Sequence, residues 1–108
     1  MSYKIILTSN FKKEAKRLAK KYKSLKIELE ILGQELSNNP TQGTSLGNDV
    51  YKIRLAISSK GKGKSGGVRI ITFIKIDNQT VLLLSIYSKG EKDSISDNEI
   101  GKLLTKFI

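Results

Sequence analysis

Basic side chains fill the stretch from residue 52 to residue 75, which holds no Asp or Glu, and this composition suits chemistry on an anion. Cations at this density repel one another unless a bound anion neutralises them. The glycines of the loop at residues 58–67 let backbone N–H groups approach such an anion closely. The stretch therefore predicts a groove for a phosphate backbone, and a solvated loop is the alternative. Its basic residues are Lys52, Arg54, Lys60, Lys62, Lys64, Arg69 and Lys75.

The end of a later apolar run supplies further candidates. Tyr87 and Lys89 are two residues apart, so they project from the same face of an extended chain. Pairing of the apolar runs around the turn at residues 77–79 would bring Arg69 close to them. We therefore expect five side chains to converge on one sheet surface as catalytic candidates. They are Lys52, Arg54, Arg69, Tyr87 and Lys89. Two alternatives stay open, namely Tyr87 as a core aromatic and Lys89 as an ordinary loop charge.

Composition narrows the possible chemistry. The chain has 108 residues, which indicates one domain over residues 1–108. The absence of Cys and His excludes thiol catalysis, Cys-ligated zinc and imidazole chemistry, and we expect neither a metal nor a cofactor. The spacing of Gly61 and Gly66 matches a nucleotide-binding P-loop, but Gly67 follows where that motif requires Lys.

The charge balance indicates the kind of partner. A net charge of +10 predicts binding to a polyanion, and nucleic acid is favoured over a generically basic surface. No apolar run is long enough to span a membrane, and the N-terminus does not match a secretory signal, so we expect a cytoplasmic protein that binds no membrane.

A basic helix is predicted after a first strand at Tyr3–Leu7. Thr8, Ser9 and Asn10 are candidate N-caps, and an apolar face follows at helical spacing from Phe11 to Tyr22. Rows of cations cover the other side of this helix and repel one another unless an anion relieves them. We assign these cations to RNA binding: Lys12, Lys13, Lys16, Arg17 and Lys20.

A second helix follows from Ser24 to about Ser37. It carries Leu25, Leu29, Leu32 and Leu36 with Ile27 and Ile31, so we expect it to pack on both the sheet and the first helix. The Gly-containing segment at residues 41–49 is predicted to be a loop.

The remaining sequence predicts three strands and a terminal helix. Strands are expected at Val50–Ile57, Val68–Ile76 and Val81–Tyr87, and Ser96 with Glu99 matches a capping box before a short helix. The resulting order is β-α-α-β-β-β-α. It predicts an α+β fold in which a helical hairpin packs on a mainly antiparallel four-stranded sheet.

Four segments together carry a resemblance to a known family. They are Tyr51–Leu55 (YKIRL), residues 60–67 (KGKGKSGG), Val68–Ile71 (VRII) and residues 86–93 (IYSKGEKD). With the element order, they resemble the RelE/ParE toxin superfamily, especially its HigB-like branch, over nearly the whole chain.

The resemblance implies a toxin of a type II toxin–antitoxin pair. RelE and HigB members are metal-independent mRNA endoribonucleases that act in the ribosomal decoding site and inhibit translation. By the same resemblance, Lys52 and Arg54 match the basic strand residues, Arg69 the Arg of the central strand, and Lys89 the cation after the last strand. Gly90 stands where RelE-type members have a second cation, and Tyr87 could replace their late Tyr.

The implied partners are an antitoxin protein, mRNA and the ribosome with its small-subunit rRNA. Two alternatives from the same fold remain, a ParE-like inhibitor of DNA gyrase and a non-catalytic RNA-binding protein. The basic sheet face favours the ribonuclease, because a gyrase inhibitor needs no Lys/Arg site there.

Overall fold

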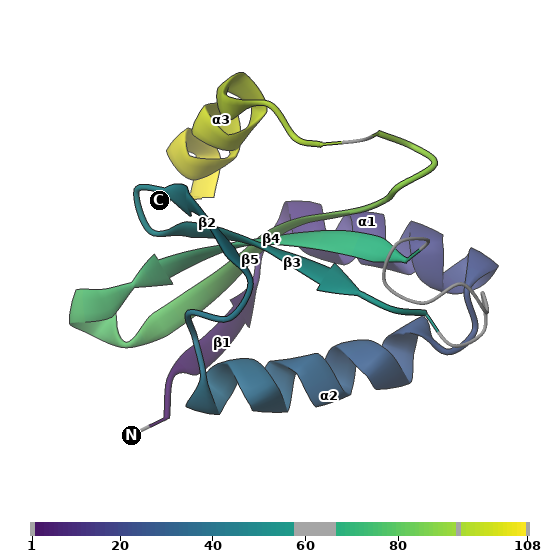
Figure 1. The fold of residues 1–108 in the computed structure, drawn as a ribbon, viewed down its shortest axis with the longest axis horizontal. Helices are drawn as coiled ribbons and strands as arrows, with labels where there is room; N and C mark the ends of the chain where they lie inside the picture. The colour runs from purple at the N-terminus through teal and green to yellow at the C-terminus, as the bar shows by residue number, and fades with distance from the viewer. Residues whose placement is uncertain (1, 58–66, 93, 108) are drawn as a thin grey trace.

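The computed structural model describes residues 2–57, 67–92 and 94–107, which form one mixed sheet with helices on both of its faces (Figure 1). The helices are α1 (Ser9–Lys21), α2 (Leu25–Asn38) and α3 (Asp97–Phe107), and none of these described helices is long and apolar enough to cross a membrane. The strands are β1 (Lys4–Leu7), β2 (Thr44–Gly47), β3 (Val50–Leu55), β4 (Val68–Lys75) and β5 (Thr80–Ser88). The predicted α+β fold and its element order are confirmed, with one strand more than expected.

The sheet has the order β1-β5-β4-β3-β2, so β4 is the central strand. Strands β2 to β5 form an antiparallel meander, and β1 joins the edge by parallel pairing with β5. The first strand of the chain is therefore an edge strand. Parallel pairing is possible there because the α1–α2 hairpin and the meander provide a long crossover between the two strands.

The prediction of a loop at residues 41–49 was wrong, because β2 lies inside it. All four β2 residues are exposed, so no alternation of apolar and polar side chains reveals the strand. The hairpin to β3 turns at Asn48 and Asp49, with φ values of 54° and 64°. Two consecutive positive φ values are typical of the type I′ turn that joins tightly paired strands. Gly43 is required before the strand, since an added Cβ would lie 2.5 Å from the Lys52 carbonyl oxygen.

Two apolar cores lie on opposite faces of the sheet. Side chains of α1 and α2 pack against one face, where Ile53, Ile70 and Ile86 are buried. The other face carries a smaller core around Ile71 and Leu84, which α3 covers through residues 100, 103 and 104. The sequence alternates along the strand predicted from Val50 to Ile57, and Tyr51, Ile53, Leu55 and Ile57 all join the first core. Lys52 and Arg54 therefore project toward the face that α3 covers in part.

The caps of α1 and α3 form as the sequence predicts, whereas Ser24, before α2, makes no side-chain cap hydrogen bond. The Thr8 hydroxyl accepts a hydrogen bond from the Phe11 backbone N–H at 3.2 Å, which caps α1. At the start of α3, the Glu99 N–H donates to the Ser96 hydroxyl at 3.1 Å, and the Ser96 N–H donates to the Glu99 carboxylate at 3.4 Å. Each end thus gains a partner for backbone N–H groups that the helix itself leaves unpaired.

Helix α2 packs through only part of its apolar surface. Leu25, Leu32 and Leu36 are buried in the first core, but Ile27 is 62% exposed and Ile31 is 52% exposed. These isoleucines lie one turn apart on a side of α2 that faces neither the sheet nor α1. The expectation that this helix packs on both the sheet and α1 is confirmed, but these two isoleucines take no part in that packing.

Candidate functional site

Three side chains of the predicted site lie in one row across the sheet. Arg54 of β3 pairs with Arg69 of β4, and Arg69 pairs with Tyr87 of β5. Directly paired residues project from the same face of a sheet with short Cβ–Cβ distances. The structure therefore brings three of the five predicted side chains together across the sheet. Lys52 lies two pairs further along β3, opposite Ile71, and so projects from the same face as Arg54.

The members of the row differ in exposure. Arg54 is exposed and Lys52 is half-buried, so both cations can reach an anion in solvent. Arg69 is 4% exposed and Tyr87 is 1% exposed. The Arg69 guanidinium donates to the Val68 carbonyl at 3.5 Å. A phosphate can therefore reach Arg69 only after the chain around this side chain moves.

Tyr87 belongs to the core beneath α3, which matches the core-aromatic alternative. It packs with Ile95 and Ile100, and the Lys92 ammonium lies 5.3 Å from the centre of its ring. Burial raises the pKa of the Tyr87 hydroxyl, while the Ile95 backbone and the charges of Lys92 and Arg69 oppose that rise. Within the described part of the chain, this hydroxyl has no hydrogen bond of good geometry.

The other predicted cations have separate positions. Lys89 follows β5 and is exposed, and its backbone N–H donates to the Gly67 carbonyl at 3.4 Å. Lys60, Lys62 and Lys64 lie outside the described residues. The predicted cations of α1 are exposed, while Phe11 and Leu18 on its other side are buried. The described residues contain no group of three carboxylates that could hold a metal ion.

One predicted RNA-binding residue is engaged within the chain. The Arg17 guanidinium forms an ion pair with Glu91, which follows β5, and Glu91 also accepts hydrogen bonds from the N–H and hydroxyl of Ser88. Partial burial tends to raise the pKa of Glu91, but the hydrogen bonds from Arg17 and Ser88 outweigh it and lower the pKa. Arg17 thereby ties α1 to the segment that leaves β5.

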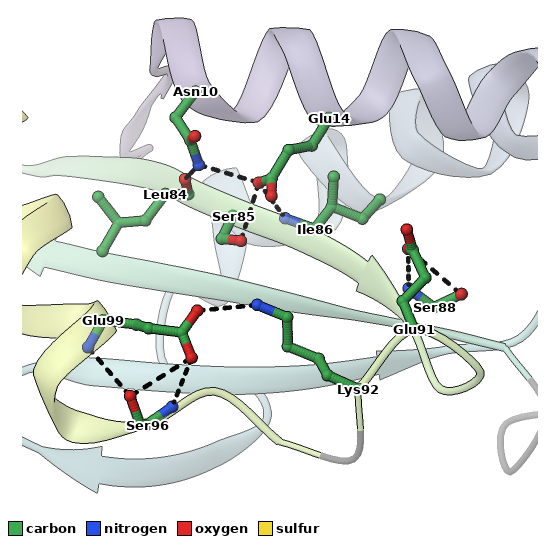
Figure 2. A network of polar contacts seen from close by, with 10 residues as sticks. All are labelled: Asn10, Glu14, Leu84, Ser85, Ile86, Ser88, Glu91, Lys92, Ser96 and Glu99. Atoms are coloured by element: carbon green, nitrogen blue, oxygen red, sulfur yellow. Dashed lines mark hydrogen bonds and ion pairs between the residues drawn. The ribbon is translucent and has the colours of Figure 1, made fainter.

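A second ion pair ties the same segment to α3. The Lys92 ammonium lies 2.8 Å from the Glu99 carboxylate, which also takes part in the capping of α3 (Figure 2). The hydrogen bond from Lys92 is the main reason that the pKa of Glu99 is lowered. Lys92 therefore contacts both Tyr87 and the first turn of α3. It thereby links the position of this helix to Tyr87, the buried residue at one end of the row.

Side chains of α1 complete the edge of β5 beyond the end of β1. Pairing between β1 and β5 stops at Leu7 and Leu83, and the next carbonyl, that of Leu84, accepts from the Asn10 amide at 2.9 Å. One oxygen of the Glu14 carboxylate accepts from the Ile86 N–H at 3.2 Å and the Ser85 hydroxyl at 2.8 Å (Figure 2). The Asn10 amide donates to the same oxygen at 2.9 Å. Glu14 thus takes the place of a paired strand beside Tyr87.

Sequence reasoning did not assign Glu14, Glu91 or Lys92 to the surroundings of this site, and it named Asn10 and Glu99 only as capping residues. One signal was present, because Glu14 is the only acid in α1 and interrupts two rows of cations. A cleft of about 250 Å³ lies beside this network and is lined by side chains of α1, β5 and α3.

Known proteins are similar to this chain over most or all of its length. The family model described as the RelE toxin of the RelE/RelB toxin–antitoxin system matches residues 3–106. The chain is similar to a free arginine-to-alanine mutant of Escherichia coli toxin RelE, with 17% identity, a TM-score of 0.66 and coverage of 100% of both chains. It is also similar to a chain of the toxin–antitoxin complex RelBE2 from Mycobacterium tuberculosis, with 17% identity, a TM-score of 0.60 and coverage of 82% of this chain and 92% of that chain.

Proposed function

Because this chain belongs to the RelE toxin family of toxin–antitoxin systems, we propose that it is an endoribonuclease that cleaves mRNA and inhibits translation. The observation that carries the proposal is the row of Arg54, Arg69 and Tyr87, with Lys52 beside it, on one face of the sheet. Strands hold side chains in fixed directions, so this row can present cations to a phosphodiester in a set geometry.

The reaction suited to these residues uses the RNA's own 2′-hydroxyl. Its oxygen attacks the adjacent phosphorus while the bond to the 5′-oxygen of the next nucleotide breaks, which leaves a 2′,3′-cyclic phosphate and a 5′-hydroxyl. A base accepts the 2′-hydroxyl proton, and an acid donates a proton to the leaving oxygen. Lys52 and Arg54 would stabilise the negative charge that develops on the phosphorane, as preorganised cations do in other active sites.

Arg69 has a role in this reaction once the neighbouring chain moves. Its fork can donate two parallel hydrogen bonds to paired phosphorane oxygens, which a lysine cannot do. Lys89, which is exposed at the end of β5, is the candidate acid or base. With these cations in place, the reaction needs no metal ion to neutralise the phosphate.

We further propose that cleavage takes place on the ribosome. The exposed cations of α1 suit the phosphate backbone of structured small-subunit rRNA, while the row holds the scissile mRNA step. The toxin–antitoxin complex among the similar structures supports a cognate antitoxin as the second partner. Acidic side chains of that antitoxin would meet Arg54, Arg69 or α1.

Incubation of the purified protein with mRNA, with and without programmed ribosomes, tests the function. We expect cleavage when programmed ribosomes are present, and the products should carry 2′,3′-cyclic phosphate ends. On ribosomes that have been cross-linked, cleavage should be the same in EDTA as in Mg²⁺. Arg54→Ala should slow it. Lys75→Ala should not, because Lys75 pairs with Thr80 at the opposite end of β4 from Arg69 and so lies apart from the row, although the sequence grouped it with the predicted groove. RNA binding without cleavage would favour the non-catalytic alternative, and inhibition of gyrase supercoiling would favour the ParE-like one.

A further inference from the structure

Two carboxylates provide acceptors for the outer edge of β5 on either side of Tyr87. The Ile86 N–H donates to Glu14 at 3.2 Å, and the Ser88 N–H donates to Glu91 at 3.0 Å (Figure 2). Ile86 and Ser88 are both buried. Their N–H groups lie two residues apart, so they point to the same edge of the strand. The backbone around Tyr87 is therefore held by side chains where a neighbouring strand would otherwise pair.

Arg17 of α1 compensates the charge of the second carboxylate. It forms an ion pair with one oxygen of Glu91. The other oxygen of that carboxylate accepts from the Ser88 N–H and, at 3.3 Å, from the Ser88 hydroxyl. Glu14 lies three residues before Arg17, so the two side chains are neighbours on the surface of α1. One guanidinium thus stands beside the groups that hold the end of β5.

The same guanidinium belongs to the exposed cations of α1 that suit an RNA backbone. Within the described part of the chain, Arg17 is the one of these cations that pairs with a carboxylate. Its side chain is 56% exposed and that of Glu91 is 33% exposed, so a phosphate can reach the pair from solvent. Phosphate oxygens accept paired hydrogen bonds from a guanidinium as a carboxylate does. An RNA phosphate on α1 would therefore compete with Glu91 for Arg17.

Loss of this cation would weaken the hold of Glu91 on Ser88. A phosphate that has taken Arg17 brings a second negative charge next to the carboxylate, and the repulsion between them favours movement of Glu91 away from α1. Ser88 directly follows Tyr87, which pairs with Arg69 across the sheet. Arg69 is 4% exposed, so a phosphate reaches it only after such a movement. The contact with α1 and the access to Arg69 therefore depend on the same segment.

We propose that Glu91 is a positioning residue for the row, and that Arg17 makes its hold on Ser88 depend on RNA. An RNA backbone bound to α1 takes the guanidinium, Glu91 loosens, and the chain over the buried end of the row opens. The proposal rests on the proposed function for RNA as the ligand of α1. Binding on α1 and opening of the row are then coupled by no more than an exposed ion pair contributes, which is about fivefold at most.

Amide hydrogen exchange tests the coupling with a short RNA duplex whose 2′-O-methyl groups prevent cleavage. A saturating amount of this duplex at low salt should speed exchange of the Ser88 N–H in the wild type by about two- to fivefold. The Ile74 N–H, which donates to the Asp49 carbonyl at 2.9 Å near the other end of β4, should exchange at an unchanged rate. Unchanged or slower exchange at Ser88, equal acceleration at Ile74, or failure of the duplex to bind would each overturn the proposal.

Variants of α1 separate the coupling from binding alone. Arg17→Gln should speed exchange at Ser88 by about two- to fivefold without RNA, and the duplex should then add nothing. Lys13→Gln is the matched control, because it removes an exposed cation one turn earlier on α1 and should weaken duplex binding while the response of Ser88 persists. Arg17→Lys should also keep the response, since lysine can pair with Glu91. A wild-type response in Arg17→Gln would contradict the role of this pair.

Cleavage of mRNA on programmed ribosomes, measured beside the exchange, distinguishes this proposal from the proposed function. If the wild type cleaves no RNA while the duplex still speeds exchange at Ser88 through Arg17, the coupling stands and the ribonuclease assignment fails. If the wild type cleaves mRNA and the bound duplex leaves Ser88 unchanged, the ribonuclease assignment stands and the coupling fails.

Discussion

Removal of the Glu14 carboxylate should loosen the edge of β5 beside Tyr87. Glu14→Ala deletes the acceptor of the Ile86 N–H and of the Ser85 hydroxyl, both of which belong to buried residues. A buried donor without a partner costs about 1–3 kcal/mol. Glu14 also lines an open cleft, so water can reach the vacated position and partly replace the carboxylate.

The loss of the acceptor for these two buried donors should therefore destabilise the fold by about 2 kcal/mol in total. At about 4–8 °C per kcal/mol for a domain near this size, the unfolding midpoint should fall by roughly 8–16 °C. Glu14→Gln should recover most of the loss, because all three hydrogen bonds go to one oxygen that a glutamine carbonyl can replace.

Urea denaturation and amide hydrogen exchange measure this effect. Exchange at Ile86 should accelerate in Glu14→Ala about tenfold for each 1.4 kcal/mol of local stability lost. Glu35→Ala, on the exposed side of α2, is the matched control and should change stability by less than about 0.5 kcal/mol. Equal behaviour of the two variants, or unchanged protection of Ile86, would refute the role of α1 in completing the sheet.

Two further predictions concern charge. The lowered pKa of Glu91 stabilises the fold above the ordinary pKa of 4.5, and this stabilisation is lost as pH falls through the pKa of Glu91 in the folded protein. Below about pH 4.5, the urea midpoint of the wild type should therefore fall more steeply than that of Glu91→Gln. Parallel curves would contradict the ion pair with Arg17. Replacement of the three loop lysines, Lys60, Lys62 and Lys64, should flatten the slope of log RNA affinity against log salt by about 2, at about 0.7 for each single-strand phosphate contact. An unchanged slope would mean that the loop does not contact RNA.

Periodicity predicted those parts of the fold in which one side of an element is buried. The alternation from Tyr51 to Ile57 and the helical spacing from Phe11 to Tyr22 both reflect burial on the helix side of the sheet. Strand β2 has no buried face, so the sequence around Thr44 contains only turn signals. The exposure of Ile27 and Ile31 was unpredictable for a related reason, because apolar character alone does not say which surfaces find a partner within the chain.

The site was predictable where local pairing determines it. A short connection at residues 76–79 pairs β4 with β5 so that Arg69 lies opposite Tyr87, and the register of β3 then adds Arg54. The contacts of Glu14, Glu91 and Lys92 depend on where α1 and α3 lie beside β5. The position of α1 follows from the end of β1 at Leu7, and the position of α3 follows from its packing on the second core. Such contacts join residues far apart in sequence, and no local pattern encodes them.

The rate of a single turnover on programmed ribosomes tests the central claim most directly, with wild type and Arg69→Ala compared at saturating ribosomes. If Arg69 stabilises the phosphorane, the variant should cleave about 10²–10³-fold more slowly. Arg69→Lys should also be slow, because lysine lacks the two-pronged geometry. Ribosome binding should persist in both variants through the cations of α1, which shows that they are folded. Equal rates for wild type and Arg69→Ala would contradict the account and move the active site to Lys52 and Arg54.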